Sequence, residues 1–525
     1  MIRISYASLL VALFVGVSES AGNSPPPNIV LVLNDDQDLT LGGWTPMNKT
    51  RQLLKGQTAM NWFIHTPVCC PSRGQLLTGR YFHNIRESSP SGGCMHVNTS
   101  IVNPDTFGTR LSTLGYVLGY FGKHMNQAPH APPSGWDCDR CAWFANGGGS
   151  DVEPGGFFNA TFSDFYGNVP VGPDEYHHEA GTYKADTNGE YAGYTTSIIA
   201  NKSIAWIERI ARNGTAPFML TLASKSPHVP ATPAPWYANA FASERAPRNA
   251  AYNASSETLA DHHELIARQP IITKDQADVI DELFRNRWRT LLSVDDAIEA
   301  IYMTLQKLDL LRTTYFIVTS DHGYNLGQHR LPSCKLNVYD HDTRIPFLIA
   351  GPHLDEGTFE FLGSNVDVAP TILDLAGATN EMLVDLDGRS VLPLLFSDEE
   401  DTISGGKEKR PWRQQHLIEY HSLGNVVRTD HLVDDTISNT YRALRFSATH
   451  STFSGLLYAE FTSLSDWHFQ NVSFYETFNT TTDPHQLENI YHTLDSEQKQ
   501  SLNILLDKLW RCKGQQAGGG ESSCP

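Results

Sequence analysis

The chain has 525 residues, with 39 basic and 58 acidic side chains and a formal net charge of −19. This acidity argues against a nucleic-acid-binding protein or a general polyanion-binding surface, but it leaves room for an anionic substrate held by a few local cations. Eight cysteines are too few for a disulfide scaffold in a chain of this length. The length allows a large core and more than one domain.

The first residues have the order of a secretory signal peptide. Arg3 precedes an apolar stretch, residues 6–17, and small residues follow up to Ala21. The apolar stretch is too short to cross a bilayer, so we predict a signal peptide at 1–21 and no transmembrane segment. Asn-x-Ser/Thr sequons, which also occur by chance, agree with passage through the secretory pathway and predict glycosylation. They stand at Asn48, Asn98, Asn159, Asn201, Asn213, Asn253, Asn471 and Asn479. We expect a lysosomal or extracellular protein.

Short apolar runs after the prolines at 25–27 predict buried strands. In chain order they lie at 29–33, 217–224, 315–319 and 345–352. The amphipathic stretch 294–308 predicts a helix that leads into the third strand. Strands that alternate with helices indicate an α/β domain with a largely parallel sheet, which we place at 25–397. Ligands bind at the carboxyl ends of such strands.

The composition changes after this domain. Residues 398–411 are polar and rich in Gly and Pro, which predicts a linker. Short strand-like runs and a final helix at 496–510 then predict a smaller α+β domain, 412–525, with an antiparallel sheet packed on a helix. Cys512 and Cys524 flank a short Gly-rich segment of a secreted chain, so we expect a disulfide between them.

Residues 69–80 read Cys-Cys-Pro-Ser-Arg-Gly-Gln-Leu-Leu-Thr-Gly-Arg. This stretch resembles the signature of the sulfatase family, C-x-P-S-R followed by three residues and L-T-G-R. The resemblance implies an alkaline-phosphatase-like fold and oxidation of Cys69 to formylglycine by a formylglycine-generating enzyme. Cys70 is then the variable neighbour and remains a cysteine. The alternative is that Cys69 and Cys70 are ordinary structural thiols.

The implied nucleophile explains why a cysteine occupies this position. One hydroxyl of the hydrated aldehyde attacks sulfur and displaces the alcohol, and the other then loses its proton and expels sulfate. A serine would be left as a stable sulfate ester. Arg73, one turn further on, is expected to hold the hydrate and to screen negative charge. With Cys69 consumed, seven cysteines remain, so at least one is expected to be free in a monomer.

Acidic residues follow two of the predicted strands. Asp35 and Asp36 stand after the first, and Asp321 and His322 after the third. A single Asp in such a place usually caps a turn or a helix. In the sulfatase pattern, however, these four residues resemble the ligands of a divalent metal, which the formylglycine at Cys69 completes. Calcium is the ion expected by resemblance, with magnesium as the alternative. Many family members carry Asn where this chain has His322.

Two lysines and a histidine also match the family's pattern. Lys123 and Lys335 resemble the lysines that hold the sulfate, and His228 resembles the histidine that protonates the departing alcohol. Asn126 is a candidate substrate contact. Without the resemblance, lone lysines and histidines are usually surface or core residues. Met125 stands where several members have a histidine, and we interpret the neighbouring His124 as structural.

The resemblance covers nearly all of the chain after the predicted signal peptide. Residues 412–421, 482–494 and 509–514 are similar to the N-acetylglucosamine-6-sulfatase branch. The implied activity is removal of 6-O-sulfate from N-acetylglucosamine in glycosaminoglycans. A generic arylsulfatase and a phosphodiesterase of the same superfamily are the alternative enzymes. A catalytically dead carbohydrate-binding protein is the non-enzymatic alternative, but it predicts loss of site residues, and none is lost.

Overall fold

The structure is a computed structural model. It describes residues 25–87, 94–127, 129, 131–147, 156–158, 160, 162–167, 169–170, 193–212, 214, 216–396, 411–427, 433–515 and 524. The predicted signal peptide, nearly all of the predicted linker and the sequons at Asn159 and Asn213 lie outside the described residues. The predicted domain boundaries therefore stay predictions.

A ten-stranded sheet forms the centre of the molecule, in the order β11-β2-β10-β9-β1-β8-β4-β5-β6-β7. Its strands are β1 (Asn28–Asn34), β2 (Gln57–Ala59), β4 (Val117–Lys123), β5 (Ala142–Asn146), β6 (Ser163–Tyr166), β7 (Val169–Pro170), β8 (Phe218–Ala223), β9 (Thr314–Ser320), β10 (Phe347–Ala350) and β11 (Gly357–Phe359). Strands β9, β1, β8, β4 and β5 run parallel, whereas β10, β6 and β7 are antiparallel to their neighbours. The predicted α/β class with a largely parallel sheet is confirmed.

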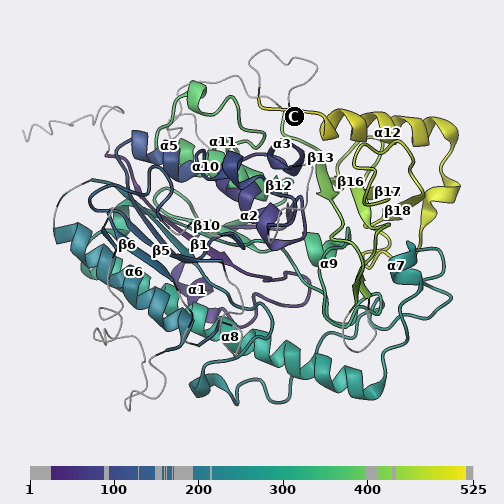
Figure 1. Cartoon of the computed structure of the whole chain (residues 1–525), viewed down its shortest axis with the longest axis horizontal. Coiled ribbons are helices and arrows are strands. Elements are labelled where there is room, and N and C mark those ends of the chain that lie inside the picture. The colour runs from purple at the N-terminus through teal and green to yellow at the C-terminus, as the bar shows by residue number, and fades with distance from the viewer. Residues whose placement is uncertain are drawn as a thin grey trace, which may run out of the picture.

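Helices cover both faces of this sheet. In Figure 1, α6 and α8 lie on one face and α2, α5 and α10 on the other, so the apolar strands β1, β8 and β9 are buried on both sides. The helices are α1 (Asn48–Leu53), α2 (Cys69–Thr78), α3 (Phe82–Ile85), α4 (Thr99–Val102), α5 (Phe107–Thr113), α6 (Thr195–Arg212), α7 (Glu264–Ala267), α8 (Lys274–Lys307), α9 (Asp340–Thr343), α10 (Val368–Leu375), α11 (Leu392–Leu395) and α12 (Ser496–Trp510). Shorter 3-10 turns lie at Pro235–Tyr237, Leu311–Thr313, Asn365–Asp367, Asn380–Met382 and Ile490–Thr493. Helix α8 is far longer than the predicted 294–308. None of the helices described here is long and apolar enough to cross a membrane.

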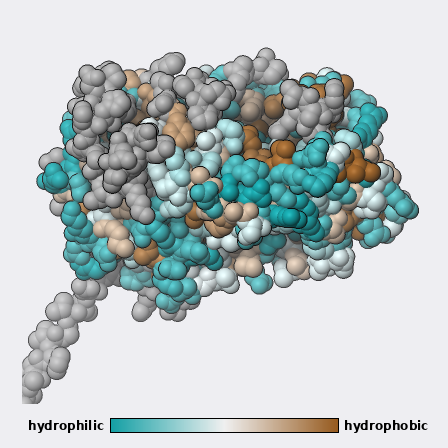
Figure 2. All heavy atoms as spheres, turned by 90° about the horizontal axis from the view of Figure 1, so that it is seen from below, coloured by the Kyte–Doolittle hydropathy of each residue, from teal (hydrophilic) through white to brown (hydrophobic). Residues whose placement is uncertain are grey.

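A second sheet lies beside the first and is antiparallel throughout (Figure 1). Its order is β13 (Gln415–Tyr420), β16 (Thr440–Phe446), β17 (Leu456–Thr462) and β18 (Phe474–Asn479), and α12 packs against it. This arrangement confirms the predicted antiparallel sheet and final helix. Two short pairs complete the strands: β3 (Trp62–Phe63) with β12 (Gly363–Ser364), and β14 (Val426–Val427) with β15 (Val433–Asp435). Among the coloured residues on the face shown in Figure 2, most are hydrophilic, and hydrophobic residues form clusters between them.

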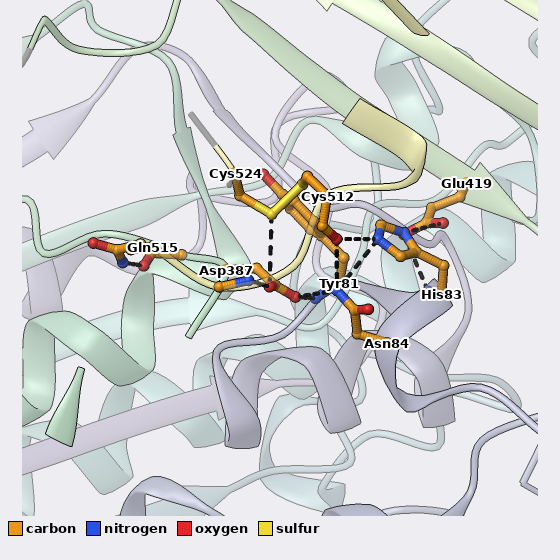
Figure 3. The surroundings of a disulfide bond; sticks show 10 residues. Tyr81, His83, Asn84, Asp387, Glu419, Cys512, Gln515 and Cys524 are labelled. Carbon is orange, nitrogen blue, oxygen red and sulfur yellow. Dashed lines mark hydrogen bonds and ion pairs between the residues drawn. A yellow bond between two sulfur atoms is a disulfide. The ribbon is translucent and has the colours of Figure 1, made fainter. Parts of the chain in front are cut away.

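Three disulfides join six of the cysteines. They are Cys70–Cys94, Cys138–Cys141 and Cys512–Cys524, and the buried thiols of Cys69 and Cys334 form no disulfide in the described part of the chain. Cys70 is thus a disulfide partner rather than a free thiol beside Cys69. The Cys512–Cys524 disulfide packs against the part of the chain that precedes the predicted linker, next to Asp387 and Asn84 (Figure 3).

The described sequon asparagines differ in how their side chains are used. Asn48 and Asn471 are exposed, and Asn98, Asn201 and Asn479 are half-buried. Asn253 donates its amide to the carbonyl of Ile272 and accepts the N–H of Ile272 with its oxygen, at 3.1 and 2.8 Å. A glycan on Nδ2 of Asn253 would have to fit beside this pair of hydrogen bonds, so we expect this sequon to be the poorest acceptor of the described ones.

Candidate active site

Two central strands bring the acidic residues to one place. Asp35 and Asp36 follow β1, and Asp321 follows the neighbouring strand β9. The backbone N–H of Asp36 donates to Asp321 Oδ1 at 2.9 Å, and the N–H of Asp321 donates to the carbonyl of Asn34 at 3.0 Å. The parallel pairing of β1 with β9 therefore brings Asp36 next to Asp321, although about 285 residues separate them in the sequence. All three carboxylates are fully buried.

Cys69 begins helix α2 and faces this acidic group. Its Sγ lies 3.5 Å from Asp35 Oδ1, 3.3 Å from His322 Nε2 and 3.3 Å from Lys335 Nζ. Burial opposes ionisation of the thiol, but Lys123 and Lys335 outweigh it and lower the pKa of Cys69 well below its ordinary value. The helix N-terminus also favours negative charge at this position.

Four side chains form a cluster suited to a metal ion. Ligand atoms of Asp35, Asp36, Cys69 and His322 all lie within 4.8 Å of one another, and all four residues are buried. Asp36 Oδ2 is buried without a hydrogen-bond partner among the residues that the structure describes. The ring of His322 places Nδ1 2.9 Å from the carbonyl of Gly323, which assigns its proton to Nδ1 and leaves Nε2 facing Asp36 at 3.2 Å. The two carboxylates are ligands that a hard divalent cation prefers, whereas the thiol and the imidazole are softer ligands, so calcium or magnesium would need an oxygen atom in place of the sulfur at position 69.

Asp321 lies beside this cluster rather than within it. Its Oδ1 accepts the N–H groups of Asp36 and His322, and its Oδ2 accepts Arg73 Nε at 2.8 Å. Burial, together with the charge of Asp35, raises the pKa of Asp321 to about 6. Burial disfavours the charged form of His322, but Asp321 and Asp36 raise the pKa of His322 to about 9.

Three permanent cations surround the same group. Lys123, at the end of β4, contacts Asp35 Oδ2 at 2.5 Å, and Lys335 contacts Asp36 Oδ1 at 2.6 Å. Arg73 bonds Asp321 and also donates to the carbonyl of Lys123 at 2.8 Å, so it fixes the end of that strand. Burial opposes ionisation of Asp35, yet Lys123 and the neighbouring cations hold the pKa of Asp35 well below its ordinary value.

The remaining predicted residues lie around this centre. His228 is half-buried, and its Nδ1 lies 2.6 Å from the carbonyl of Val229. Burial raises the pKa values of Asp35 and Asp36, whereas the lysines and, to a smaller extent, His228 lower them. Asn126 is half-buried, and its Oδ1 has no partner among the described residues. His124 points elsewhere.

The ring of His124 contacts Tyr120 and Trp143, with centroids 5.3 and 5.2 Å away. Burial lowers the pKa of His124 to about 3, in keeping with a structural role. Sequence analysis missed Arg287 and Asp38, which lie behind the acidic residues. A charged residue in the middle of an amphipathic helix gives no sign in the sequence that it is buried.

Comparison with known proteins identifies the class. The family model described as Sulfatase matches residues 27–378. The chain belongs to the sulfatase family. It is 35% identical to the N-acetylglucosamine-6-sulfatase of Capra hircus over 532 residues, which cover 95% of this chain and 86% of that protein. It is 34% identical to the N-acetylglucosamine-6-sulfatase of Homo sapiens over 531 residues, which cover 95% and 87% of the two chains. The chain is therefore a sulfatase closely similar to that branch.

Solved structures show the same fold. A protein in complex with its substrate D-glucosamine-2-N,6-O-disulfate superposes with a TM-score of 0.63 at 21% identity, covering 92% of this chain and 97% of that one. The phosphonate monoester hydrolase of Silicibacter pomeroyi superposes with a TM-score of 0.62 at 17% identity, covering 92% and 94%. At these identities the likeness concerns the fold, which two different ester-cleaving chemistries share.

Proposed function

We propose that this sulfatase removes 6-O-sulfate from N-acetylglucosamine at the non-reducing end of glycosaminoglycans, with formylglycine at position 69 and one divalent metal ion, calcium or magnesium. The observation that carries the proposal is the position of Cys69. Its Sγ lies 3.3 Å from both Lys335 and His322, beside buried carboxylates, at the start of α2. Cys69 and Arg73 lie in a complete sulfatase signature, and the chain belongs to the family.

Each residue then has a distinct role. A hydroxyl oxygen of the hydrated formylglycine attacks sulfur while the bond from sulfur to the sugar oxygen breaks, and His228 gives that oxygen its proton. Lys123 and Lys335 hold the sulfate oxygens, and Asn126 contacts the substrate. The second hydroxyl of the hydrate then loses its proton, the carbon–oxygen bond to sulfate breaks, and the aldehyde is restored. Arg73 orients the hydrate.

The metal would be held by Asp35, Asp36 and His322 together with the modified Cys69, whose ligand atoms lie within 4.8 Å of one another, and Asp321 would stand beside it. When bound, a divalent cation lowers the cost of bringing an anionic ester beside carboxylates and acidifies oxygen atoms that it contacts. Arg73 and the backbone N–H groups fix Asp321 in place independently of that ion.

The choice of 6-sulfated N-acetylglucosamine rests on the relatives and on charge. The site chemistry is common to sulfatases, so sugar selectivity must come from surrounding loops and from the second sheet. Two N-acetylglucosamine-6-sulfatases are 34–35% identical to nearly the whole chain. The net charge of −19 disfavours a long polyanion lying along an open groove and favours attack on a chain end.

Two measurements test this proposal. Mass spectrometry of active protein, produced with a formylglycine-generating enzyme, should find formylglycine at Cys69. Sulfate release should then be compared for N-acetylglucosamine-6-sulfate, N-acetylgalactosamine-4-sulfate and a simple aryl sulfate, with Cys69→Ala as the inactive control. An unmodified Cys69 in active enzyme would falsify the mechanism. Rapid turnover of the aryl ester, with none of the 6-sulfated sugar, would make the protein a generic arylsulfatase.

A phosphoryl-transfer activity is the second candidate. The shared fold with a phosphonate monoester hydrolase favours testing it. Phosphate diesters, phosphonate monoesters and sulfate esters should be assayed side by side, and we expect the sulfate esters to react fastest.

For location, we propose the lysosome or the extracellular space. Treatment of the secreted protein with an endoglycosidase, followed by peptide mapping, would show which sequons carry glycans.

A further inference from the structure

One buried guanidinium connects the loops that carry the active-site residues. Arg287 lies within α8, and only 2% of it is exposed. Its Nη2 donates to the carbonyl of Asp36 at 2.6 Å and to Asp38 Oδ1 at 2.9 Å, and its Nη1 donates to the carbonyl of Pro227 at 3.1 Å. Its guanidinium carbon also lies 4.1 Å from the centroid of the Tyr324 ring.

These partners belong to three loops, each of which follows a central strand. Asp36 and Asp38 follow β1, Pro227 follows β8, and Tyr324 follows β9. The three strands are adjacent and parallel, so their loops leave the sheet side by side. Arg287 reaches all three loops from the helix behind them. Any shift of its guanidinium would therefore displace groups in several parts of the site at once.

The contact with Asp36 is the most consequential. Asp36 has φ of 68°, a left-handed conformation that is uncommon for residues other than glycine, although aspartate adopts it more readily than most. Arg287 holds the carbonyl of Asp36, while the carboxylate of the same residue faces Lys335 at 2.6 Å and His322 at 3.2 Å. The direction of the carboxylate is thus coupled to the hydrogen bond on the other side of the residue.

The contact with Pro227 reaches the proposed proton donor. Pro227 immediately precedes His228, whose backbone N–H is fixed separately by the carbonyl of Lys225 at 2.9 Å. The carboxylate partner Asp38 is itself held, because its Oδ2 accepts the N–H groups of Leu41 and Gly43. The guanidinium therefore bridges anchored groups, and its planar fork of donors suits three acceptors in a way that a single ammonium does not.

We propose that Arg287 is a positioning residue for sulfate-ester hydrolysis, which sets the orientation of the Asp36 carboxylate and the place of His228 without touching the substrate. This inference rests on the proposed function, because it assigns Asp36 to the metal and His228 to the leaving group. Burial of a guanidinium is costly, and replacing buried ionic groups by well-packed apolar side chains is often neutral or stabilising. We therefore attribute to Arg287 the relative placement of the three loops.

The test compares Arg287→Lys and Arg287→Ala with matched changes at Arg289. Arg289 is on the same helix, is 6% exposed, and bonds the carbonyl of Ala240 and the side chain of Glu282. For Arg287→Lys, turnover of a simple aryl sulfate should fall about 10- to 100-fold in kcat with KM nearly unchanged, and the Ca²⁺ dissociation constant, measured by calorimetry, should rise about 10-fold or more. Guanidinium ions should restore part of kcat to Arg287→Ala and none to Arg289→Ala.

Several results would overturn the inference. Wild-type kcat and Ca²⁺ affinity in Arg287→Lys would show that the fork of donors is not needed. Equal losses in Arg289→Lys would show that both arginines only stabilise α8. If Arg287→Ala does not fold, Arg287→Lys and its Ca²⁺ affinity still decide. If the wild-type protein binds Ca²⁺ but cleaves no sulfate ester, the proposed function fails, whereas the change in Ca²⁺ affinity still tests the role of Arg287.

Discussion

Replacing Glu419 by Gln should destabilise the protein at acidic pH and much less at alkaline pH. Glu419 lies on β13 of the second sheet and is fully buried, and its carboxylate oxygens accept from His83 Nδ1 at 3.0 and 3.1 Å. His83 Nε2 lies 2.9 Å from the carbonyl of Cys512 in the tail (Figure 3). Nδ1 therefore faces the carboxylate, and Nε2 faces the carbonyl of Cys512 with Asn84 Nδ2 3.3 Å away; only the protonated ring can donate to both the carboxylate and the carbonyl. Burial disfavours this charge, but Glu419 outweighs burial and raises the pKa of His83.

The expected magnitude follows from the burial of the pair. Removing one partner of a buried ion pair costs about 3–5 kcal/mol, and Gln keeps the size of Glu and one acceptor, so we expect about 3 kcal/mol. An unfolding entropy of about 2.1 cal/mol/K per residue gives about 1.1 kcal/mol/K for 525 residues. The unfolding temperature should therefore fall by about 3 °C if the chain unfolds as one unit.

The sign of the pH dependence is fixed by the direction of the His83 shift. Because the pKa of His83 is raised in the folded state, its contribution is fully present below the ordinary histidine value of about 6.5. That contribution is lost as the pH rises through the folded-state value. Glu419→Gln should therefore show its full deficit at about pH 5.5 and a smaller one at alkaline pH, above the raised folded-state pKa of His83.

Calorimetry or circular dichroism of both proteins at the two pH values measures the difference. His83→Gln in the Glu419→Gln background serves as the control, because with both charges gone the remaining pH dependence belongs to other groups. A deficit in unfolding temperature that is the same at both pH values would refute the reasoning. So would a deficit that grows with pH.

Two further predictions concern the metal and the tail. Asp36→Ala or Asp321→Ala should lower sulfate-ester turnover at least about 100-fold with an unchanged circular dichroism spectrum; wild-type turnover after exhaustive chelation would show that the metal site is wrong. Cys524→Ser should lower the free energy of unfolding by about 2–3 kcal/mol, since the tail disulfide closes a short loop seated on Asp387. Alkylation of both tail cysteines in unreduced native protein would contradict the pairing.

The central sheet was largely predictable, because short continuous apolar runs such as 29–33 and 315–319, bounded by polar and turn residues, are typical of strands buried on both faces. Helix α12 was predicted with the bounds that the structure shows. The first half of α8 was not, because residues 274–290 are rich in charged side chains and their apolar stripe is interrupted. Its start is clear in the structure, where Thr273 and Gln276 form a capping box. The pairing of β10 antiparallel to β9 also depends on chain direction, which an apolar run does not encode.

Site residues that belong to a sequence motif could be predicted, whereas residues that reach the site only through long-range contacts could not. The signature identified Cys69 and Arg73, and the strand ends identified the acidic residues. Arg287 escaped because its partners, Asp36 and Pro227, are 251 and 60 residues away in sequence. The His83–Glu419 pair spans 336 residues. No local pattern distinguishes a buried charge with such a partner from a solvated one, since the pairing exists only after the sheets have formed.

The charged side chains of the site balance one another before any metal is bound. Three carboxylates and three permanent cations meet there: Asp35, Asp36, Asp321, and Arg73, Lys123, Lys335. Their charges cancel, so without a metal the pocket offers little net attraction to a sulfate ester in a chain of net charge −19. A divalent cation held by Asp35, Asp36 and His322 would make this balance positive and would favour binding of the anionic ester. Calorimetry of Ca²⁺ binding to the wild-type protein and to Asp36→Ala tests this expectation. Equal affinity in the two proteins would show that Ca²⁺ does not bind at these carboxylates.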